Sequence, residues 1–180
     1  MGTILITDAS VLINLVASGV AGDILSGCGM EFKVCPDVIR EVKILRDRET
    51  GKEHAIDLEP FFADGSFERI EPQTDSEFEL LIDYAALLGA GDGEAMCFAL
   101  AESRRHPIAI DDERAIRRAK KRNPNFETLG TLKILILWQE LNSVADERMG
   151  QLLQSIFRYA RFRPAALHPH YAWWQRCWGG

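Results

Sequence analysis

Apolar and polar positions alternate along this chain with two different periods. Residues 3–7 form an almost continuous apolar run, as expected of a strand that is buried on both faces of a parallel sheet. Shorter runs of the same kind, or with strict alternation, predict further strands. These lie at 32–34, 67–70, 108–110 and 126–129.

Between these runs, apolar residues recur every three or four positions, which predicts amphipathic helices. Thr74 and Glu77 have the spacing of a capping box at the start of one such helix. That helix carries four apolar residues on one face: Phe78, Leu81, Ile82 and Ala85. We interpret the polar stretch at 46–54 as an exposed helix end and a connection. The predicted helices cover 11–16, 38–45, 53–62, 78–85, 94–102, 113–121, 131–142 and 145–160.

The alternation of strands and helices favours right-handed β–α–β crossovers, a parallel sheet and helices on both of its faces. We therefore expect an α/β fold. With 180 residues and 47 % hydrophobic residues, the chain is long and apolar enough for one core. In folds of this class, functional groups gather beyond the carboxyl ends of the strands.

Acidic residues stand where four of the apolar runs stop. They are Asp8, Glu41, Glu94 and the adjacent pair Asp111 and Asp112. A carboxylate at the end of a buried strand is partly desolvated, which costs free energy. Several together are tolerated when a divalent cation neutralises them. Each acid taken alone is also explained as a helix cap or a surface charge, whereas the whole set predicts a metal-dependent phosphodiester hydrolase.

The net charge of −6 does not exclude RNA as a partner, because its distribution matters more than its sum. Two divalent cations at the acids would reduce it to −2. Basic residues concentrate at 104–106 and 114–122, around the last acidic pair. Arg114 and Arg118 are four residues apart and are our candidates for contacts with an RNA backbone. The alternative for such a stripe is a solvated helix face.

The chain carries signs of a cytoplasmic protein. Its four cysteines form no C-x-x-C pair, which favours reduced thiols. No apolar run approaches the roughly 18 residues that span a bilayer, so we expect no membrane contact. The first apolar run has no basic region ahead of it, which argues against a secretory signal.

Six segments, taken in order, carry a likeness to a known family. They are residues 4–15, 36–42, 93–101, 108–114, 129–135 and 161–163. In the first, a strand ends in Asp8 and Ser10 follows two residues later; the next three carry the other acids. With this order and spacing over residues 3–165, the chain resembles the PIN domains, and in particular short prokaryotic members related to the VapC-type toxins.

The resemblance implies a three-layer α/β/α sandwich around a central parallel sheet, at residues 1–165. It also implies an endoribonuclease that depends on Mg²⁺ or Mn²⁺, often a homodimer and often a toxin held inactive by a small antitoxin protein. Residues 166–180 would form a C-terminal tail that packs on the domain or on a partner through its tryptophans. The histidines of this tail match no common zinc spacing.

We assign roles to the acids on the chemistry of phosphodiester hydrolysis, which two hard cations held by carboxylates can promote. Asp8 is the predicted central metal ligand, completed by Glu94 and Asp112. Glu41 is predicted to act through a second metal or a bound water. Ser10 either bonds a carboxylate or water or caps the first helix.

Two of these assignments have competitors nearby in the sequence. Asp92 competes with Glu94, where PIN domains usually carry Asp, and Asp111 competes with Asp112. Many family members carry Thr or Ser at the position of Ile110, so this chain lacks that hydroxyl group. The rival function is therefore a non-catalytic PIN-fold module that binds RNA or protein through a weakened metal site.

Overall fold

A five-stranded parallel sheet forms the centre of the computed structural model, which describes residues 3–89 and 91–179. Its strand order is β5-β2-β1-β6-β7. The strands are β1 (Thr3–Thr7), β2 (Met30–Val34), β5 (Phe67–Arg69), β6 (Ile108–Ala109) and β7 (Thr128–Leu129). All five predicted strands are present.

Strand β1 is the most buried part of the sheet because it has a neighbour on each side. Leu5 lies beside Phe32 of β2, and Ile6 lies beside Ile108 of β6. Strands β2 and β5 continue the sheet on one side of β1, whereas β6 and β7 continue it on the other. The chain therefore adds strands first on one side of β1 and then, from β6 onward, on the other. The position between β1 and β6 is thus the switch point of the sheet, where α/β folds place their ligand crevice.

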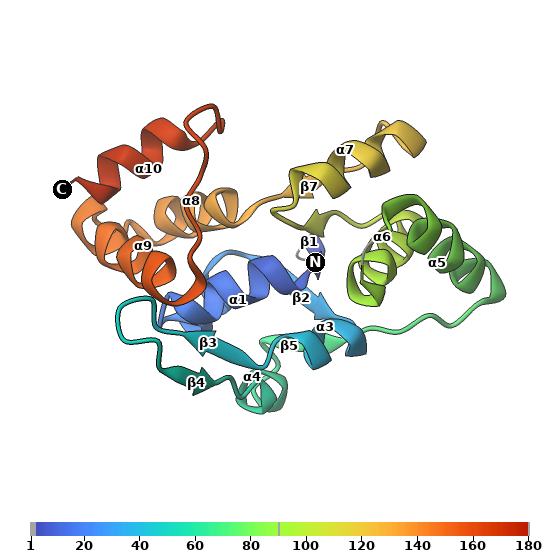
Figure 1. Ribbon diagram of the computed structural model, residues 1–180, viewed down its shortest axis with the longest axis horizontal. Helices are drawn as coiled ribbons and strands as arrows, with labels where there is room; N and C mark the ends of the chain where they lie inside the picture. The colour runs from blue at the N-terminus through green and yellow to red at the C-terminus, as the bar shows by residue number, and fades with distance from the viewer. Residues whose placement is uncertain (1–2, 90, 180) are drawn as a thin grey trace.

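Helices cover the sheet in two groups. Helix α6 packs against β1 and β6 with α5 and α3 beside it, and α2 packs against β2 with α1 and α8. Figure 1 shows α5 and α6 on one side of the molecule and α8, α9 and α10 on the other. The expected three-layer α/β/α sandwich is confirmed. The helices are α1 (Ala9–Ala17), α2 (Ala21–Gly27), α3 (Pro36–Glu41), α4 (Glu59–Ala63), α5 (Asp75–Leu88), α6 (Asp92–Arg104), α7 (Glu113–Arg122), α8 (Thr131–Asn142), α9 (Asp146–Ala160) and α10 (Tyr171–Trp178).

Helix α5 begins at the predicted cap but buries a different face. The Thr74 side chain accepts the Glu77 backbone N–H at 3.3 Å, while Glu77 accepts the N–H of Gln73 at 2.7 Å. Glu77 also pairs with Arg104 of α6 at 2.7 Å, which turns it inward. As a result Phe78 and Ile82 of the predicted apolar face are 50 % and 68 % exposed.

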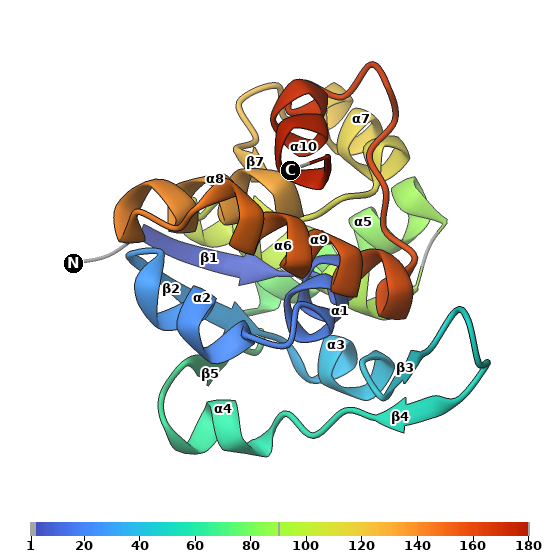
Figure 2. The ribbon, with the colours of Figure 1, turned by 90° about the vertical axis from the view of Figure 1, so that its left-hand side faces the viewer.

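A two-stranded antiparallel sheet replaces the predicted end of one helix and start of the next. Helix α3 stops at Glu41, and β3 (Ile44–Arg46) pairs with β4 (Glu53–Ala55). Burial does not stabilise this hairpin, since its strands are mostly exposed. Asp47 instead pairs with Arg158 of α9 at 2.6 Å. Figure 2 shows the hairpin at the periphery, away from β1.

The tail contains a helix, α10, that the sequence pattern did not predict. It packs on α9. The Trp173 indole N–H donates to the Gln139 side chain at 2.7 Å, and Arg176 pairs with Asp146 at 2.7 Å. Gly150 of α9 permits the contact, because a Cβ there would lie 2.4 Å from the Cys177 carbonyl oxygen.

The described residues contain no single helix that is long and apolar enough to cross a membrane. Helices α1 and α2 reach such a composition only as a pair, and this pair is bent by 115°.

Candidate active site

Asp8 lies at the carboxyl end of the central strand. Its backbone N–H donates to the Ala109 carbonyl at 3.0 Å, so the ends of β1 and β6 adjoin. The side chain is 6 % exposed and serves as the N-cap of α1. Ser10 donates both its backbone N–H (3.1 Å) and its hydroxyl (2.7 Å) to Asp8 Oδ2. Ser10 therefore orients the carboxylate, and the helix cap is Asp8 itself.

Glu94 in the first turn of α6 lies within electrostatic reach of three other predicted acids. Burial raises its pKa to about 7, and the negative charges of Asp8, Asp112 and Glu41 contribute to the rise. These four side chains come from four separate segments of the chain, and the fold brings them to one edge of the sheet. Such mutual repulsion is what clustered carboxylates produce when no cation separates them.

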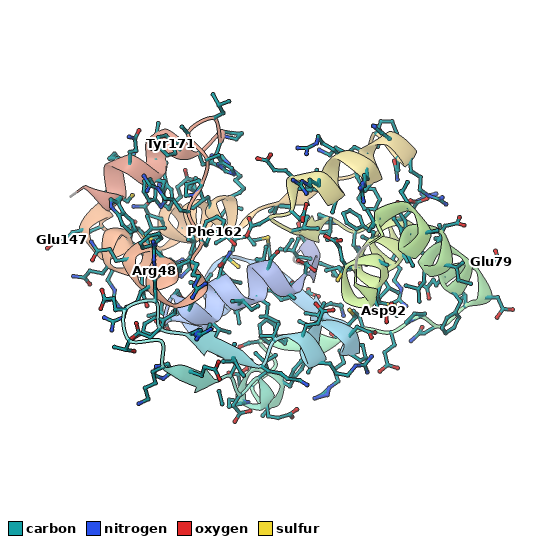
Figure 3. All side chains as sticks on the ribbon, in the orientation of Figure 1. Arg48, Glu79, Asp92, Glu147, Phe162 and Tyr171 are labelled. Carbon is teal, nitrogen blue, oxygen red and sulfur yellow. The ribbon has the colours of Figure 1, made fainter. Side chains whose placement is uncertain are left out.

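Glu41 ends α3 and reaches the start of α6. Its carboxylate rests against Gly93, where an added Cβ would lie 2.8 Å from Oε1. Burial raises the pKa of Glu41, and the charge of Asp8 raises it further, while the Gly93 backbone N–H acts in the opposite direction. Asp92, the competitor of Glu94, is exposed at the first position of α6 (Figure 3) and acts electrostatically on Glu41.

The two acids after β6 have different environments. Asp112 is exposed and caps α7, since its Oδ1 accepts the backbone N–H groups of Arg114 (2.7 Å) and Ala115 (2.9 Å). Asp111 turns inward instead, and burial raises its pKa. Asp112 is the one whose charge acts on Glu94, whereas Asp111 lies within electrostatic reach of Asp8.

Two polar residues that the sequence reading missed hold Asp111 in place. Asn14 donates to its Oδ2 at 3.0 Å, and Thr131 donates its hydroxyl to Oδ2 (2.5 Å) and its backbone N–H to Oδ1 (2.9 Å). Asn14 is only 4 % exposed on a helix that otherwise buries apolar residues. A polar residue on a buried helix face, six positions after Asp8, is the signal that could have identified it.

A chain of hydrogen bonds joins these residues to Asp8. The Asp111 backbone N–H reaches the Ser10 hydroxyl at 3.4 Å, and that hydroxyl donates to Asp8. Below the acids, the thiols of Cys35 and Cys97 lie 3.8 Å apart, and Cys97 Sγ donates to the Thr7 carbonyl at 3.7 Å. These buried thiols pack the strand end before Asp8 against α3 and α6, which restricts the backbone positions of Asp8 and Glu94.

Carboxylate oxygens are the ligands that Mg²⁺ and Mn²⁺ prefer, so the donor set fits a hard divalent cation. Within residues 3–89 and 91–179, however, no three acidic, histidine or cysteine side chains lie close enough to hold one ion together. The acids share one edge and repel each other there. If Asp8, Glu94 and Asp112 all bind the same cation, their side chains would have to rotate closer together than they are here.

Some of the predicted basic residues are paired with acids, and Arg118 lies within electrostatic reach of the site. Arg117 pairs with Glu113 at 3.4 Å, and Arg122 pairs with Asp83 at 3.1 Å. The Arg118 guanidinium donates to the Leu88 carbonyl, and its positive charge lowers the pKa of Glu94. Arg114 is exposed beside Asp112.

Comparison with known proteins assigns a family to this arrangement. No curated protein and no solved structure shows significant similarity to the chain. A family model described as a PIN domain matches residues 4–166, which include the central sheet except Thr3, the four acids and the hydrogen-bonded Asn14 and Thr131. The chain belongs to the PIN domain family, whose fold is of the nuclease type.

Proposed function

We propose that this protein is a metal-dependent endoribonuclease that hydrolyses RNA phosphodiester bonds. The observation that carries the proposal is the position of Glu94, which is half-buried among the charges of Asp8, Glu41 and Asp112 at the switch point of the sheet. A fold that only binds RNA gains nothing from four acids that repel each other and the RNA backbone.

Asp8, Glu94 and Asp112 would hold Mg²⁺ or Mn²⁺, and Glu41 would bind a second cation or a water. When bound, the cation neutralises charge on the phosphate and lowers the pKa of an attacking water. The residues around the acids orient them. Ser10 fixes one oxygen of Asp8, and Gly93 leaves room for the Glu41 carboxylate.

Positive charge near the acids would position the substrate. Arg118 lies within electrostatic reach of Glu94 and is held by the Leu88 carbonyl, so it would contact a phosphate next to the site. Arg114 would add a second, more mobile contact. Within this proposal RNA is the substrate, the protein acts in the cytoplasm as a homodimer, and a small antitoxin protein is its inhibitor, as for the prokaryotic toxins that the sequence resembles.

Thermal unfolding with EDTA or with millimolar Mn²⁺ tests the cation site. A cation that binds only the folded state adds about 2.7 kcal/mol of stability at a hundredfold excess over its Kd. We expect a rise in Tm for the wild type and for Asp23→Asn, an exposed control in α2, and none for Asp8→Asn. The same three proteins are then assayed for cleavage of a single-stranded RNA.

Two results would contradict the proposal. One is an RNA cleavage rate that Asp8→Asn leaves unchanged in a clean preparation. The other is an absence of any Mn²⁺ shift together with a higher Tm for Asp8→Asn, because relief of repulsion alone would then explain the cluster. The second result would favour the non-catalytic binding module.

A further inference from the structure

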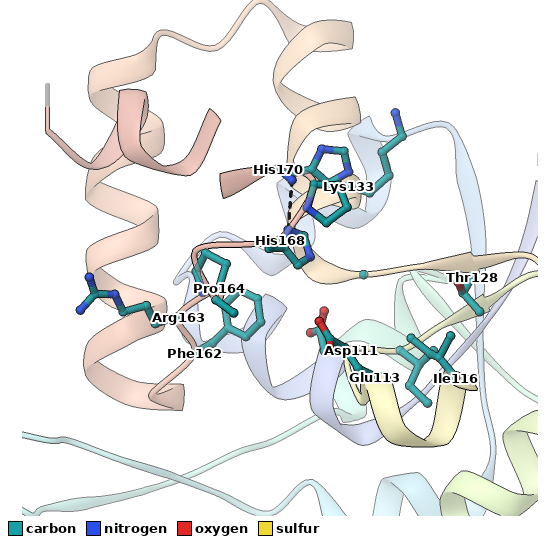
Figure 4. A pocket seen from close by; sticks show the side chains of 14 residues that line it. Asp111, Glu113, Ile116, Thr128, Lys133, Phe162, Arg163, Pro164, His168 and His170 are labelled. Carbon is teal, nitrogen blue, oxygen red and sulfur yellow. Dashed lines mark hydrogen bonds between the residues drawn. The ribbon is translucent and has the colours of Figure 1, made fainter. Parts of the chain in front are cut away.

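A cavity of about 530 Å³ opens beside Asp111, the residue before Asp112 (Figure 4). Its walls come from the ends of β6 and β7, the first turns of α7 and α8, and the segment 162–170 that leads to α10. Its volume lies within the range of roughly 300–1,000 Å³ that small-molecule sites occupy. The segment 162–170 contributes seven of the fourteen lining residues, so the end of the chain completes the cavity.

The cavity adjoins the proposed active site through Asp111, although none of the four proposed catalytic acids lines it. Asp111 lines it and directly precedes Asp112 in the chain. Through its backbone N–H, Asp111 is also joined to Ser10, and through Ser10 to Asp8. A ligand in the cavity would therefore lie next to the acids.

Part of the wall is apolar. Phe162 and Pro164 lie on one side, and Ile116 and the aliphatic part of Thr128 lie on the other (Figure 4). Phe162 and Ile116 are each half-buried, so part of each side chain is exposed in the wall of the cavity. Flat apolar surfaces of this kind are what proteins offer to an unstacked nucleobase.

The remaining wall carries hydrogen-bond donors. His168 Nδ1 accepts the His170 backbone N–H at 3.1 Å, which leaves the proton of a neutral His168 ring on Nε2. The rings of His168 and His170 are 5.6 Å apart, and Lys133 lies close enough for its charge to act on His170. Lys133 forms no ion pair within the described part of the chain.

The two acids of the cavity are already engaged. Asp111 accepts three hydrogen bonds from Asn14 and Thr131, and Glu113 pairs with Arg117. Arg163 also lines the cavity, but its guanidinium lies over the Trp174 ring and is directed away from the other lining residues (Figure 4). Lys133 and the two histidines are therefore the charged or ring donors that we assign to a bound group. A ligand that suits this wall has a flat apolar ring and an anionic part.

We propose that this cavity binds one nucleotide of a single-stranded RNA, next to the phosphate that is cleaved. The base would pack against Phe162 and Ile116, and a phosphate would contact Lys133 and the histidine pair. This inference rests on the proposed nuclease function. It adds a site that selects the substrate by the shape of one base and that the C-terminal segment completes.

Histidine NMR signals provide a direct test in EDTA, where no metal-dependent cleavage occurs. The chain has four histidines, and two of them, His54 and His106, lie outside the cavity. The protein is titrated with each of the four 5′-mononucleotides and separately with inorganic phosphate. We expect the ring signals of His168 and His170 to shift with at least one mononucleotide, while those of His54 and His106 stay in place. Equal shifts with inorganic phosphate at equal affinity would overturn the inference, because the base would then contribute nothing.

A pair of variants tests the role of the cavity in RNA binding. Lys133→Met keeps most of the side-chain stem and removes the charge. Lys120→Met removes the same charge from the exposed side of α7, outside the cavity. We expect Lys133→Met to raise the Kd for a short single-stranded RNA about tenfold, as for the loss of one charge-assisted contact, and Lys120→Met to change it less.

The two proposals fail in different ways. In one outcome, the wild type cleaves RNA although no mononucleotide shifts the signals of His168 and His170 and although Lys133→Met has the same KM as the wild type. This combination would refute the nucleotide cavity and leave the nuclease function intact. Shifts of His168 and His170 without metal-dependent cleavage would refute the nuclease and support the cavity as a nucleotide-binding site.

Discussion

The ionisation of Glu94 links the acidic cluster to the stability of the protein. Its pKa is raised to about 7 in the folded state, from an ordinary value of 4.5. Between these two values, the folded chain retains a proton that the unfolded chain releases. The free energy of unfolding without metal therefore falls as the pH rises through this window, by roughly 1–3 kcal/mol after allowance for the solvent screening of this half-exposed group.

We expect Glu94→Gln to remove this dependence. In EDTA at pH 7.5, the variant should be more stable than the wild type, and the difference should shrink toward pH 5, where Glu94 is protonated. Urea unfolding at several pH values measures both curves. If the stability of the wild type changed between pH 5 and 7.5 by the same amount as that of Glu94→Gln, neither burial nor the neighbouring acids would raise the pKa of Glu94.

Gly93 is expected to matter for activity more than for stability. A methyl group there would lie 2.8 Å from Glu41 Oε1, so Gly93→Ala pushes the carboxylate out of place. The loss of activity could reach about a hundredfold, as for misplacement by about 1 Å. Stability should change little, because the displaced atom ends a flexible side chain and alanine favours the helix by up to about 1 kcal/mol. RNA cleavage rates and urea unfolding are measured together.

Gly22→Ala is the matched control, since its nearest atom is a Phe61 ring carbon at 3.9 Å. It should retain full activity. If Gly93→Ala also retained full activity, Glu41 would have no part in catalysis.

At the residue scale, the acids were predictable and their supports were not. A charge directly after a buried strand, such as Asp8, is conspicuous in a sequence. Asn14 stands out in the sequence only as a polar residue on a buried helix face, and Thr131 does not stand out. Their shared partner, Asp111, becomes evident only when β1, β6 and β7 lie side by side. Their roles depend on contacts between residues 97 and 20 positions apart.

At the element scale, burial decides which segments could be predicted. Strand β1 and the core of α6 are buried and carry strong apolar patterns. Strands β3 and β4 are exposed and leave no such pattern. The pattern of α5 was misleading, because Glu77 is buried by its pairing with Arg104 while Phe78 and Ile82 remain outside.

Helix α10 depends on one close approach to α9. In Gly150→Ala, the new Cβ would meet the Cys177 carbonyl oxygen at 2.4 Å, a backbone atom that moves only if α10 moves. We expect a loss of about 1–3 kcal/mol, as for overpacking in a core. The indole of Trp173 would separate from Gln139, so its fluorescence should change. Thermal unfolding and emission spectra measure both effects; an unchanged Tm would mean that α10 is only loosely attached.

At the scale of the whole molecule, the charge of −6 opposes RNA binding while a local group of cations favours it. Arg118 lies within electrostatic reach of Glu94, and Arg114 is exposed in the first turn of α7, whereas Arg117 and Arg122 pair with acidic side chains. The local field near the site should therefore decide affinity, and the salt dependence of binding should count the phosphates that it contacts.

Arg114→Ala and Lys52→Ala separate the two effects, because both change the net charge from −6 to −7. Lys52 is exposed next to the β3–β4 hairpin, at the periphery of the molecule. With metal removed, the slope of log K against log salt is measured for a short single-stranded RNA. Loss of one phosphate contact in Arg114→Ala should make this slope shallower by about 0.7, while Lys52→Ala should keep the wild-type slope. Equal losses of affinity with equal slopes would mean that overall repulsion governs binding. A shallower slope in Arg114→Ala alone would place the RNA backbone along α7, whose N-cap is Asp112.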